Sequence, residues 1–387
     1  MIAVAMSIVA LSTDLVVVSL PGMARYFDVG ASRAQATLSA FIAAFGIAQL
    51  FYGPLSDRFG RRPVFLSGCA IYTVASAACA LAPSIEVLIA ARIVQGVGCC
   101  AFPVIGRAIV RDIHGAEGTA RVLGYVSAGM SMLILFGPVL GGLLEQQFGW
   151  RASVTLLAVL GTGMLAAAAV LLAESNVHLD RNATRLRDTF AKYRGLLLDR
   201  RFAGYTLCVA LNFGFIMAFL SGSPFVLINV LGLSAMEFGL LFGLTLLGFL
   251  SSSLVTARFV LKLGPDRLLQ VGTALAALAG TTMVALALAE VRSAAAIVGP
   301  YFVLMFATGL IQPSAMAGAI GPFPRIAGTA SSLLGFVQFA TGALVGFLVG
   351  RLHDGTALPM TLAIGACAWG TFFAYHLLAG PLSGRAR

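Results

Sequence analysis

The sequence is a succession of twelve apolar stretches, each about as long as a helix that crosses a lipid bilayer, for which about 20 residues are needed. Hydrophobic residues make up 59% of the 387 residues and charged residues only 10%, whereas a soluble domain is about 25% charged. A water-soluble globule could not bury so much apolar surface, which excludes a soluble enzyme, a DNA-binding domain and a disordered chain. We therefore expect an all-α polytopic membrane protein with twelve transmembrane helices near residues 3–22, 36–55, 63–82, 86–108, 121–143, 152–173, 203–228, 238–260, 268–289, 295–317, 329–350 and 357–379.

One long polar break divides these spans into six and six. We expect an amino-terminal six-helix bundle at 1–173, a basic cytoplasmic linker at 174–201, a carboxy-terminal six-helix bundle at 202–380 and a cytoplasmic tail at 381–387. The two halves echo each other weakly: GTARVLGYV at 118–126 and GTASSLLGFV at 328–337 open equivalent spans. This pattern predicts two pseudo-symmetric bundles.

The basic residues predict the orientation in the membrane. The net charge is +10, and 19 of the 25 lysines and arginines fall on the side that holds both termini, against five on the other side. Cytoplasmic loops carry such an excess, so we expect both termini in the cytoplasm and need no nucleic acid to explain the charge. The first apolar run lacks the basic start and cleavage site of a signal peptide and is expected to be retained.

The cysteines and histidines show no pattern of a metal site or of a catalytic centre. All six cysteines lie in apolar stretches without ligand spacing and are interpreted as small packing residues. Three of the four histidines lie in loops and one near the end of a span. We therefore expect no metal, no cofactor and no intramembrane enzyme.

Asp14 is the one acidic residue that cannot be placed in a loop or at a helix end. A carboxylate within a membrane span costs several kcal/mol and is by default functional. Because burial in a low dielectric disfavours the charged form, such a group can take up and release a proton near neutral pH. Asp14 is thus a candidate for proton or cation coupling; the alternative is a hydrated carboxylate near the outer surface.

Arg92 is a basic residue inside the apolar fourth span, as Asp14 is an acidic residue inside the first. Arginine cannot shed its charge and needs a partner or water. It could stabilise a deprotonated acid or bind a substrate, or its side chain could snorkel to the interface.

The most specific local motif is GPLSDRFGRRPVFLSG at 53–68. It predicts a tight cytoplasmic turn in which a carboxylate meets basic residues or a helix N-terminus; the alternative is a merely basic turn. Its candidate residues are Gly53, Asp57, Arg58, Gly60, Arg61 and Arg62.

In the fifth span, GMSMLILFGPVLGG at 129–142 predicts a kinked, closely packed helix through Gly137, Pro138, Gly141 and Gly142, with simple packing as the alternative. Other polar and aromatic residues within spans are candidates to line a cavity, although a lone amide more often bonds a neighbouring helix. They are Phe41, Phe45, Gln49, Tyr125, Asn212, Phe213, Gln312, Phe336 and Gln338.

Together these motifs resemble the major facilitator superfamily, and within it the 12-helix drug:proton antiporters of the bicyclomycin-resistance (Bcr/CflA) branch. GPLSDRFGRRP resembles the superfamily's loop-two motif, ARIVQGVGCCA at 91–101 its span-four motif, and GPVLGG at 137–142 the span-five antiporter motif. STDLVVVSLPGM at 12–23 resembles the span-one signature, and YRGLLLDRRFAGY at 193–205 the entry to span seven. The second-half counterpart of the loop-two motif, ARFVLKLGPDR at 257–267, is degenerate.

The resemblance implies a proton-driven exporter of small drug-like molecules that works by alternating access in the bacterial inner membrane. It implies that Asp14 carries the proton with Arg92 as its partner, and that Asp57 and the nearby arginines lock a cytoplasmic gate with Asp112. It further implies a monomer in the lipid bilayer, whose partners are protons and the substrate. The alternative on the same fold is proton-coupled transport of a specific nutrient or metabolite.

Overall fold

The computed structural model describes residues 1–176, 193–323 and 326–379, and at 111, 114–135, 257, 261, 327 and 328 it describes the backbone alone. Over these residues the chain is helical, without strands. The amino-terminal helices are α1 (Ile2–Tyr26), α2 (Ala31–Phe59), α3 (Arg61–Ala80), α4 (Ile85–Cys99), α5 (Ala101–Phe148) and α6 (Trp150–Leu171). The others are α8 (Arg200–Pro224) with the π-helix Phe225–Val230, α9 (Ala235–Leu263), α10 (Pro265–Leu288), α11 (Ala294–Ile320), α12 (Ala327–Arg351) and α13 (Leu358–Ala374) with the π-helix Tyr375–Ala379.

Eleven helical segments of this described part are long and apolar enough to cross a membrane. A helix satisfies all of its central backbone hydrogen bonds internally, which a bilayer requires. Three pairs of neighbouring helices are joined by a single glycine with positive φ: Gly60 at +97°, Gly149 at +75° and Gly264 at +78°. Glycine adopts this conformation without a steric penalty, so each turn can be one residue long.

The helices form two compact units. The first comprises Met1–Arg185 together with Ser234–Gly239, and the second comprises Leu186–Leu233 together with Leu240–Arg387. Both are helical bundles whose cores are built from the buried faces of long apolar helices.

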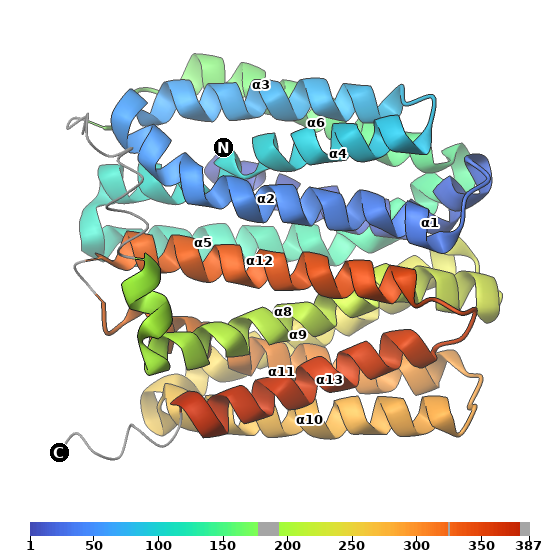
Figure 1. Ribbon diagram of the computed structural model, residues 1–387. Helices are drawn as coiled ribbons and strands as arrows, with labels where there is room; N and C mark the ends of the chain where they lie inside the picture. The colour runs from blue at the N-terminus through green and yellow to red at the C-terminus, as the bar shows by residue number, and fades with distance from the viewer. Residues whose placement is uncertain (177–192, 324–325, 380–387) are drawn as a thin grey trace. The chain divides into compact units, whose positions relative to one another are not determined.

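In the amino-terminal unit, α1 packs against α5 and α6, while α3 packs against α4 and α6 (Figure 1). Close approach depends on the glycines of the span-four motif. A Cβ atom at Gly96 would clash with the backbone oxygen of Phe41 in α2, and one at Gly98 would lie 2.5 Å from the backbone nitrogen of Tyr72 in α3. These glycines therefore set the spacing of α4 against its two neighbours.

The carboxy-terminal unit repeats this pattern of neighbours. Here α8 packs against α12 and α13, as α1 does against α5 and α6, and α10 packs against α11 and α13, as α3 does against α4 and α6. The rings of Phe219 in α8 and Tyr301 in α11 stack with centroids 3.4 Å apart. The weak echo in sequence thus corresponds to a repeat of the helix packing.

One expected loop is absent from the fold. The polar segment 111–118, which we expected to separate two spans, lies inside α5, a helix of 48 residues. The segment contains no proline and includes alanine, glutamate and arginine, which favour helix. The helix break lies instead at Cys100, so the expected span 86–108 comprises α4 and the first turns of α5. Most of the expected linker (177–192) and the tail (381–387) lie outside the described residues.

Candidate functional site

Asp14 lies in the seam between α1 and α5 with only 7% of its surface exposed. A Cβ atom built at Gly137 would lie 3.3 Å from Asp14 Cβ and 3.4 Å from its Oδ2, and one at Gly141 would lie 3.2 Å from Leu15 Cα. The Thr13 hydroxyl lies 3.2 Å from Asp14 Oδ1. No basic side chain pairs with Asp14 among the described residues. The glycines of α5 therefore place α1, and with it a buried carboxyl group, directly against the α5 backbone.

Arg92 is fully buried between α4, α1 and α2. Its guanidinium donates to Gln95 Oε1 and, over 3.0 Å, to the backbone oxygen of Ser12 in α1, and it lies 4.2 Å from the ring centroid of Phe41. Gln95 in turn donates to Ser76 Oγ over 2.7 Å. The arginine thus holds α1 and α4 together. Its side chain stays buried inside the unit and does not extend to the membrane interface.

The expected pair of Asp14 and Arg92 is not formed. Arg92 reaches α1 at Ser12, whose hydroxyl lies 2.7 Å from the Tyr72 hydroxyl of α3, whereas Asp14 faces Gly137 of α5. Residues two apart on a helix point about 200° apart. The two charged groups consequently lie on different sides of α1.

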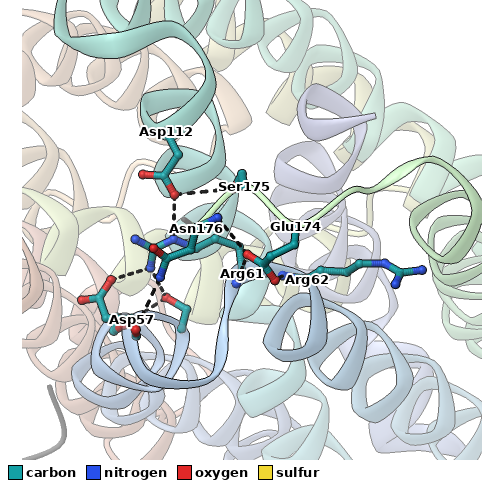
Figure 2. A network of polar contacts seen from close by, with 9 residues as sticks. Asp57, Arg61, Arg62, Asp112, Glu174, Ser175 and Asn176 are labelled. Atoms are coloured by element: carbon teal, nitrogen blue, oxygen red, sulfur yellow. Dashed lines mark hydrogen bonds and ion pairs between the residues drawn. The ribbon is translucent and has the colours of Figure 1, made fainter. Parts of the chain in front are cut away.

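The loop-two motif forms an ion-pair cluster around Arg61 (Figure 2). Arg61 Nη1 lies 2.5 Å from Asp57 Oδ1 and 2.6 Å from Ser56 Oγ, and Nε lies 2.9 Å from Asp112 Oδ2 in α5. The Arg61 side chain is only 5% exposed, and that of Asp57 is 46% exposed. The structure therefore brings together Asp57, Arg61 and Asp112, and ties the α2–α3 turn to α5.

Glu174, just after α6, completes this cluster and was missed by the sequence analysis. Its carboxylate accepts the backbone N–H groups of Arg61 (2.9 Å), Arg62 (3.1 Å) and Asn176 (2.9 Å) (Figure 2). Desolvation opposes ionisation, but these hydrogen bonds outweigh it and hold the pKa of Glu174 below its usual value of 4.5. Gly60, which precedes α3, has no side chain to cap the helix, so Glu174 supplies the cap from another part of the chain. An acidic residue beside a glycine-capped turn could have been recognised only if the ends of α2 and α6 were known to meet.

The remaining residues of the motif have other surroundings. Arg58 lies 5.1 Å from the ring centroid of Phe59, and Arg62 Nη2 donates to the backbone oxygen of Ala169 at the end of α6 over 3.1 Å. A Cβ atom at Gly53 would have no neighbour within 4 Å. Close packing therefore does not require glycine at position 53, in contrast to position 60, where the positive φ favours glycine and a Cβ atom would clash with Glu174.

The candidate cavity residues belong to both units. Phe41 and Phe45 pack together in α2, and the buried Gln49 leaves its amide oxygen without a hydrogen-bond partner in the described part of the chain. In the carboxy-terminal unit, the buried Asn212 of α8 likewise has an unpartnered amide oxygen, and the adjacent Phe213 packs on Phe339 of α12. Gln338 is buried, Gln312 and Phe336 are half-buried, and the side chain of Tyr125 lies outside the described residues. Their common role in one cavity stays a prediction.

The carboxy-terminal counterpart of the loop-two turn is held by tyrosine hydroxyl groups. Pro265 starts α10 directly after Gly264, and Tyr205 of α8 donates to Asp266 Oδ1 over 3.0 Å. The hydroxyl of Tyr375 donates to the Asp266 backbone oxygen over 3.3 Å. The degenerate sequence therefore keeps the one-residue turn but replaces the buried arginine with tyrosines.

A sequence model of the Major Facilitator Superfamily matches residues 2–347 of the chain. The chain belongs to this superfamily. Its members are transporters, and with its apolar spans and bacterial relatives the chain is a multi-pass protein of the bacterial inner membrane.

Relatives with names that refer to drug resistance are similar over most of this transporter. A bicyclomycin resistance protein homolog of Haemophilus influenzae is 30% identical over 94% of this chain and 92% of its own. A chloramphenicol resistance protein of Pseudomonas aeruginosa is 32% identical, with 91% and 84% covered. Multidrug resistance protein D of Escherichia coli is 31% identical, with 83% and 80% covered.

Solved structures show the same fold at lower identity. A crystal structure of a D-xylose–proton symporter covers 96% of both chains with a TM-score of 0.73 at 15% identity. A peptide transporter covers 97% of this chain and 92% of its own with a TM-score of 0.76 at 13% identity. These matches establish the transporter fold of the chain.

Proposed function

We propose that this transporter exports small drug-like molecules from the cytoplasm in exchange for protons. The observation that carries the proposal is the Asp14 carboxyl group, which is buried against Gly137 and lacks a basic partner among the described residues. Bacterial relatives named for resistance to bicyclomycin, to chloramphenicol and to several drugs support export.

The environment of Asp14 suits reversible protonation. A carboxylate at membrane depth without a counter-ion is costly, so the group favours either its neutral form or a state that admits water or a cationic partner. Substrate binding and protonation would then favour different conformations of the transporter. If one conformation binds the drug and the other binds the proton, each cycle of the transporter exchanges one for the other.

Arg92 and the Arg61 cluster would support this cycle by holding helices together, without binding the proton themselves. Arg92 holds α4 on α1 beside the segment that carries Asp14. The Arg61 cluster ties the α2–α3 turn to α5 and to the chain after α6. We propose that the cluster stabilises the cytoplasmic end of the amino-terminal bundle in one state of the cycle, with both termini in the cytoplasm and the protein acting as a monomer without a cofactor.

The proposal is tested in everted membrane vesicles that are acidified inside. Addition of chloramphenicol or bicyclomycin to vesicles with the wild-type protein should release protons, because drug entering the lumen exchanges for protons leaving it. Asp14→Asn should abolish this release. Asp28→Asn is the matched control, because Asp28 is an exposed acid with φ of +52°, which asparagine tolerates. Proton-driven export that is undiminished in Asp14→Asn would contradict the role of Asp14, and a silent wild-type protein across a drug panel would contradict drug export.

A further inference from the structure

The seam that buries Asp14 contains a second carboxyl group, that of Glu145. Along this seam Gly137 faces Asp14, Gly141 faces Leu15, and Glu145 faces Gly22. Residues 137, 141 and 145 are four apart and therefore lie on one face of α5. Since the residue numbers rise together, α1 and α5 run in the same direction, and Glu145 follows the two glycines on the stripe that touches α1.

Glu145 is built into the seam. Its Oε1 occupies the position where any side chain at Gly22 would begin, so glycine at position 22 makes room for the carboxyl group. Ser19 of α1 is the polar side chain that acts on this carboxyl group, while Oε2 is buried and has no hydrogen-bond partner among the described residues. A buried carboxylate oxygen without a donor is costly, and protonation of the group removes that cost.

Two hydroxyl groups lie in the interval between the two carboxyl groups. Eight residues of α1 separate Asp14 from Gly22, which corresponds to about 12 Å along the helix axis. Ser19 lies between these positions, and its hydroxyl is 3.4 Å from that of Ser153 in α6. The seam thus holds hydroxyl groups between Glu145 and Asp14, and water would have to complete a path between the two carboxyl groups.

The charged groups around Glu145 leave it without a fixed ion pair. Arg25 of α1 acts on it electrostatically, whereas Arg151 of α6 donates to the backbone oxygens of Ala80 and Ala82. The segment Ser234–Gly239, which belongs to the same unit and packs on Gly142, carries Glu237, whose carboxylate binds the Ser234 N–H and hydroxyl groups.

We propose that Glu145 is a second proton-binding carboxyl group through which Asp14 exchanges its proton with the medium at the Tyr26 end of α1. This inference rests on the proton-coupled export proposed above. In the transfer, the O–H bond of neutral Glu145 breaks as the Ser19 hydroxyl accepts that proton and passes its own to an intervening water molecule. An O–H bond of that water then breaks as an O–H bond forms on the Asp14 carboxylate. Glu145 is left as a carboxylate, which the charge of Arg25 stabilises.

The test compares the rate of proton exchange with drug binding. In everted vesicles, chloramphenicol-triggered proton efflux is measured as the lumenal pH is varied from about 5 to 8. Glu145→Gln should slow the initial rate about tenfold and flatten its dependence on lumenal pH, while equilibrium binding of chloramphenicol stays within about twofold of the wild type. Glu145→Asp should restore most of the rate. Glu86→Gln is the matched control, since Glu86 is an exposed glutamate that pairs with Arg33, and it should leave both quantities unchanged.

Two results overturn the inference while export itself stands. One is a Glu145→Gln protein whose rate and pH profile equal those of the wild type. The other is a loss of rate that is accompanied by loss of chloramphenicol binding and is not restored by Glu145→Asp, which identifies a structural role.

A second measurement requires no transport. The purified full-length protein in weakly buffered detergent is acidified, and the protons taken up are counted. Glu145→Gln and Asp14→Asn should each bind about one proton fewer than the wild type, and the double variant about two fewer. An unchanged count in Glu145→Gln overturns the inference. If the wild-type vesicles show no drug-triggered efflux but the counts behave as stated, the proposed export fails and the second proton site stands.

Discussion

Replacement of Glu174 by alanine should lower the unfolding temperature of the protein by roughly 2–4 °C. The substitution removes the acceptor of the Arg61 and Arg62 backbone N–H groups at the start of α3. Loss of a helix cap costs about 1 kcal/mol. Because Glu174 is exposed, solvent screens its charge and adds little to this value. For a unit of about 150–250 residues, about 1 kcal/mol corresponds to the stated shift.

Thermal unfolding can be followed with a thiol-reactive dye, because all six cysteines are buried in the folded protein. Glu174→Gln should lose about half as much stability as Glu174→Ala, since the amide keeps one oxygen that accepts hydrogen bonds but loses the charge. Glu86→Ala serves as a control for removing an exposed glutamate and should shift the transition little.

The effect has a defined dependence on pH. The folded-state pKa of Glu174 is lower than its usual value of 4.5, so the stabilisation is complete above about pH 4.5 and is lost as the pH falls through the folded-state value. The difference between wild type and Glu174→Ala, followed by circular dichroism, should therefore shrink in acid. An unfolding temperature unchanged by Glu174→Ala at pH 7, or a difference that persists undiminished near pH 3, would refute the capping role.

Three further substitutions test the packing and the hydrogen bonds. Arg92→Lys should reduce drug export at least about tenfold in transport assays, because a compact ammonium group lacks the planar fork with which the guanidinium reaches Gln95 and the Ser12 oxygen while it lies over the Phe41 ring; normal export would contradict this. Gly98→Ala should lower stability by about 1–3 kcal/mol, because its Cβ would press on the α3 backbone, whereas Gly53→Ala, with open space around its Cβ, should not; equal unfolding temperatures of the two variants would be the contrary result. Tyr205→Phe should cost about 1 kcal/mol through the lost bond to Asp266, and a thermal transition that does not move would exclude this contribution.

Two predicted contacts between charged residues show which interactions a local sequence pattern can predict. Asp57, Arg61 and Asp112 were predicted to meet, and they do, since Asp57 and Arg61 flank one tight turn. Asp14 and Arg92 were predicted to pair on the strength of a resemblance, and they do not, because they lie on different sides of α1. The meeting of Asp57 and Arg61 needed only a turn, whereas the place of Asp112 was implied by the resemblance and depends on how α5 packs. The pairing of Asp14 and Arg92 depended on how each helix is rotated about its axis.

The sequence by itself determined the membrane environment, the succession of apolar spans, the division into halves and the superfamily motifs. These depend on hydropathy, charge and spacing over short segments, which are properties of the local chain. The sequence also indicated which charged residues are anomalous in lipid, because that anomaly follows from composition alone.

Only the tertiary structure decided which partners these residues have. Glu174 caps a helix that begins 113 residues earlier in the chain, and Glu145 fits against Gly22 of α1 across the seam that also holds Asp14. The sequence of a helix that is apolar on all sides does not show which of its faces packs against which neighbouring helix. That choice is made by glycines that admit close approach and by polar groups that find partners far away in sequence, and both act only when the bundle is assembled.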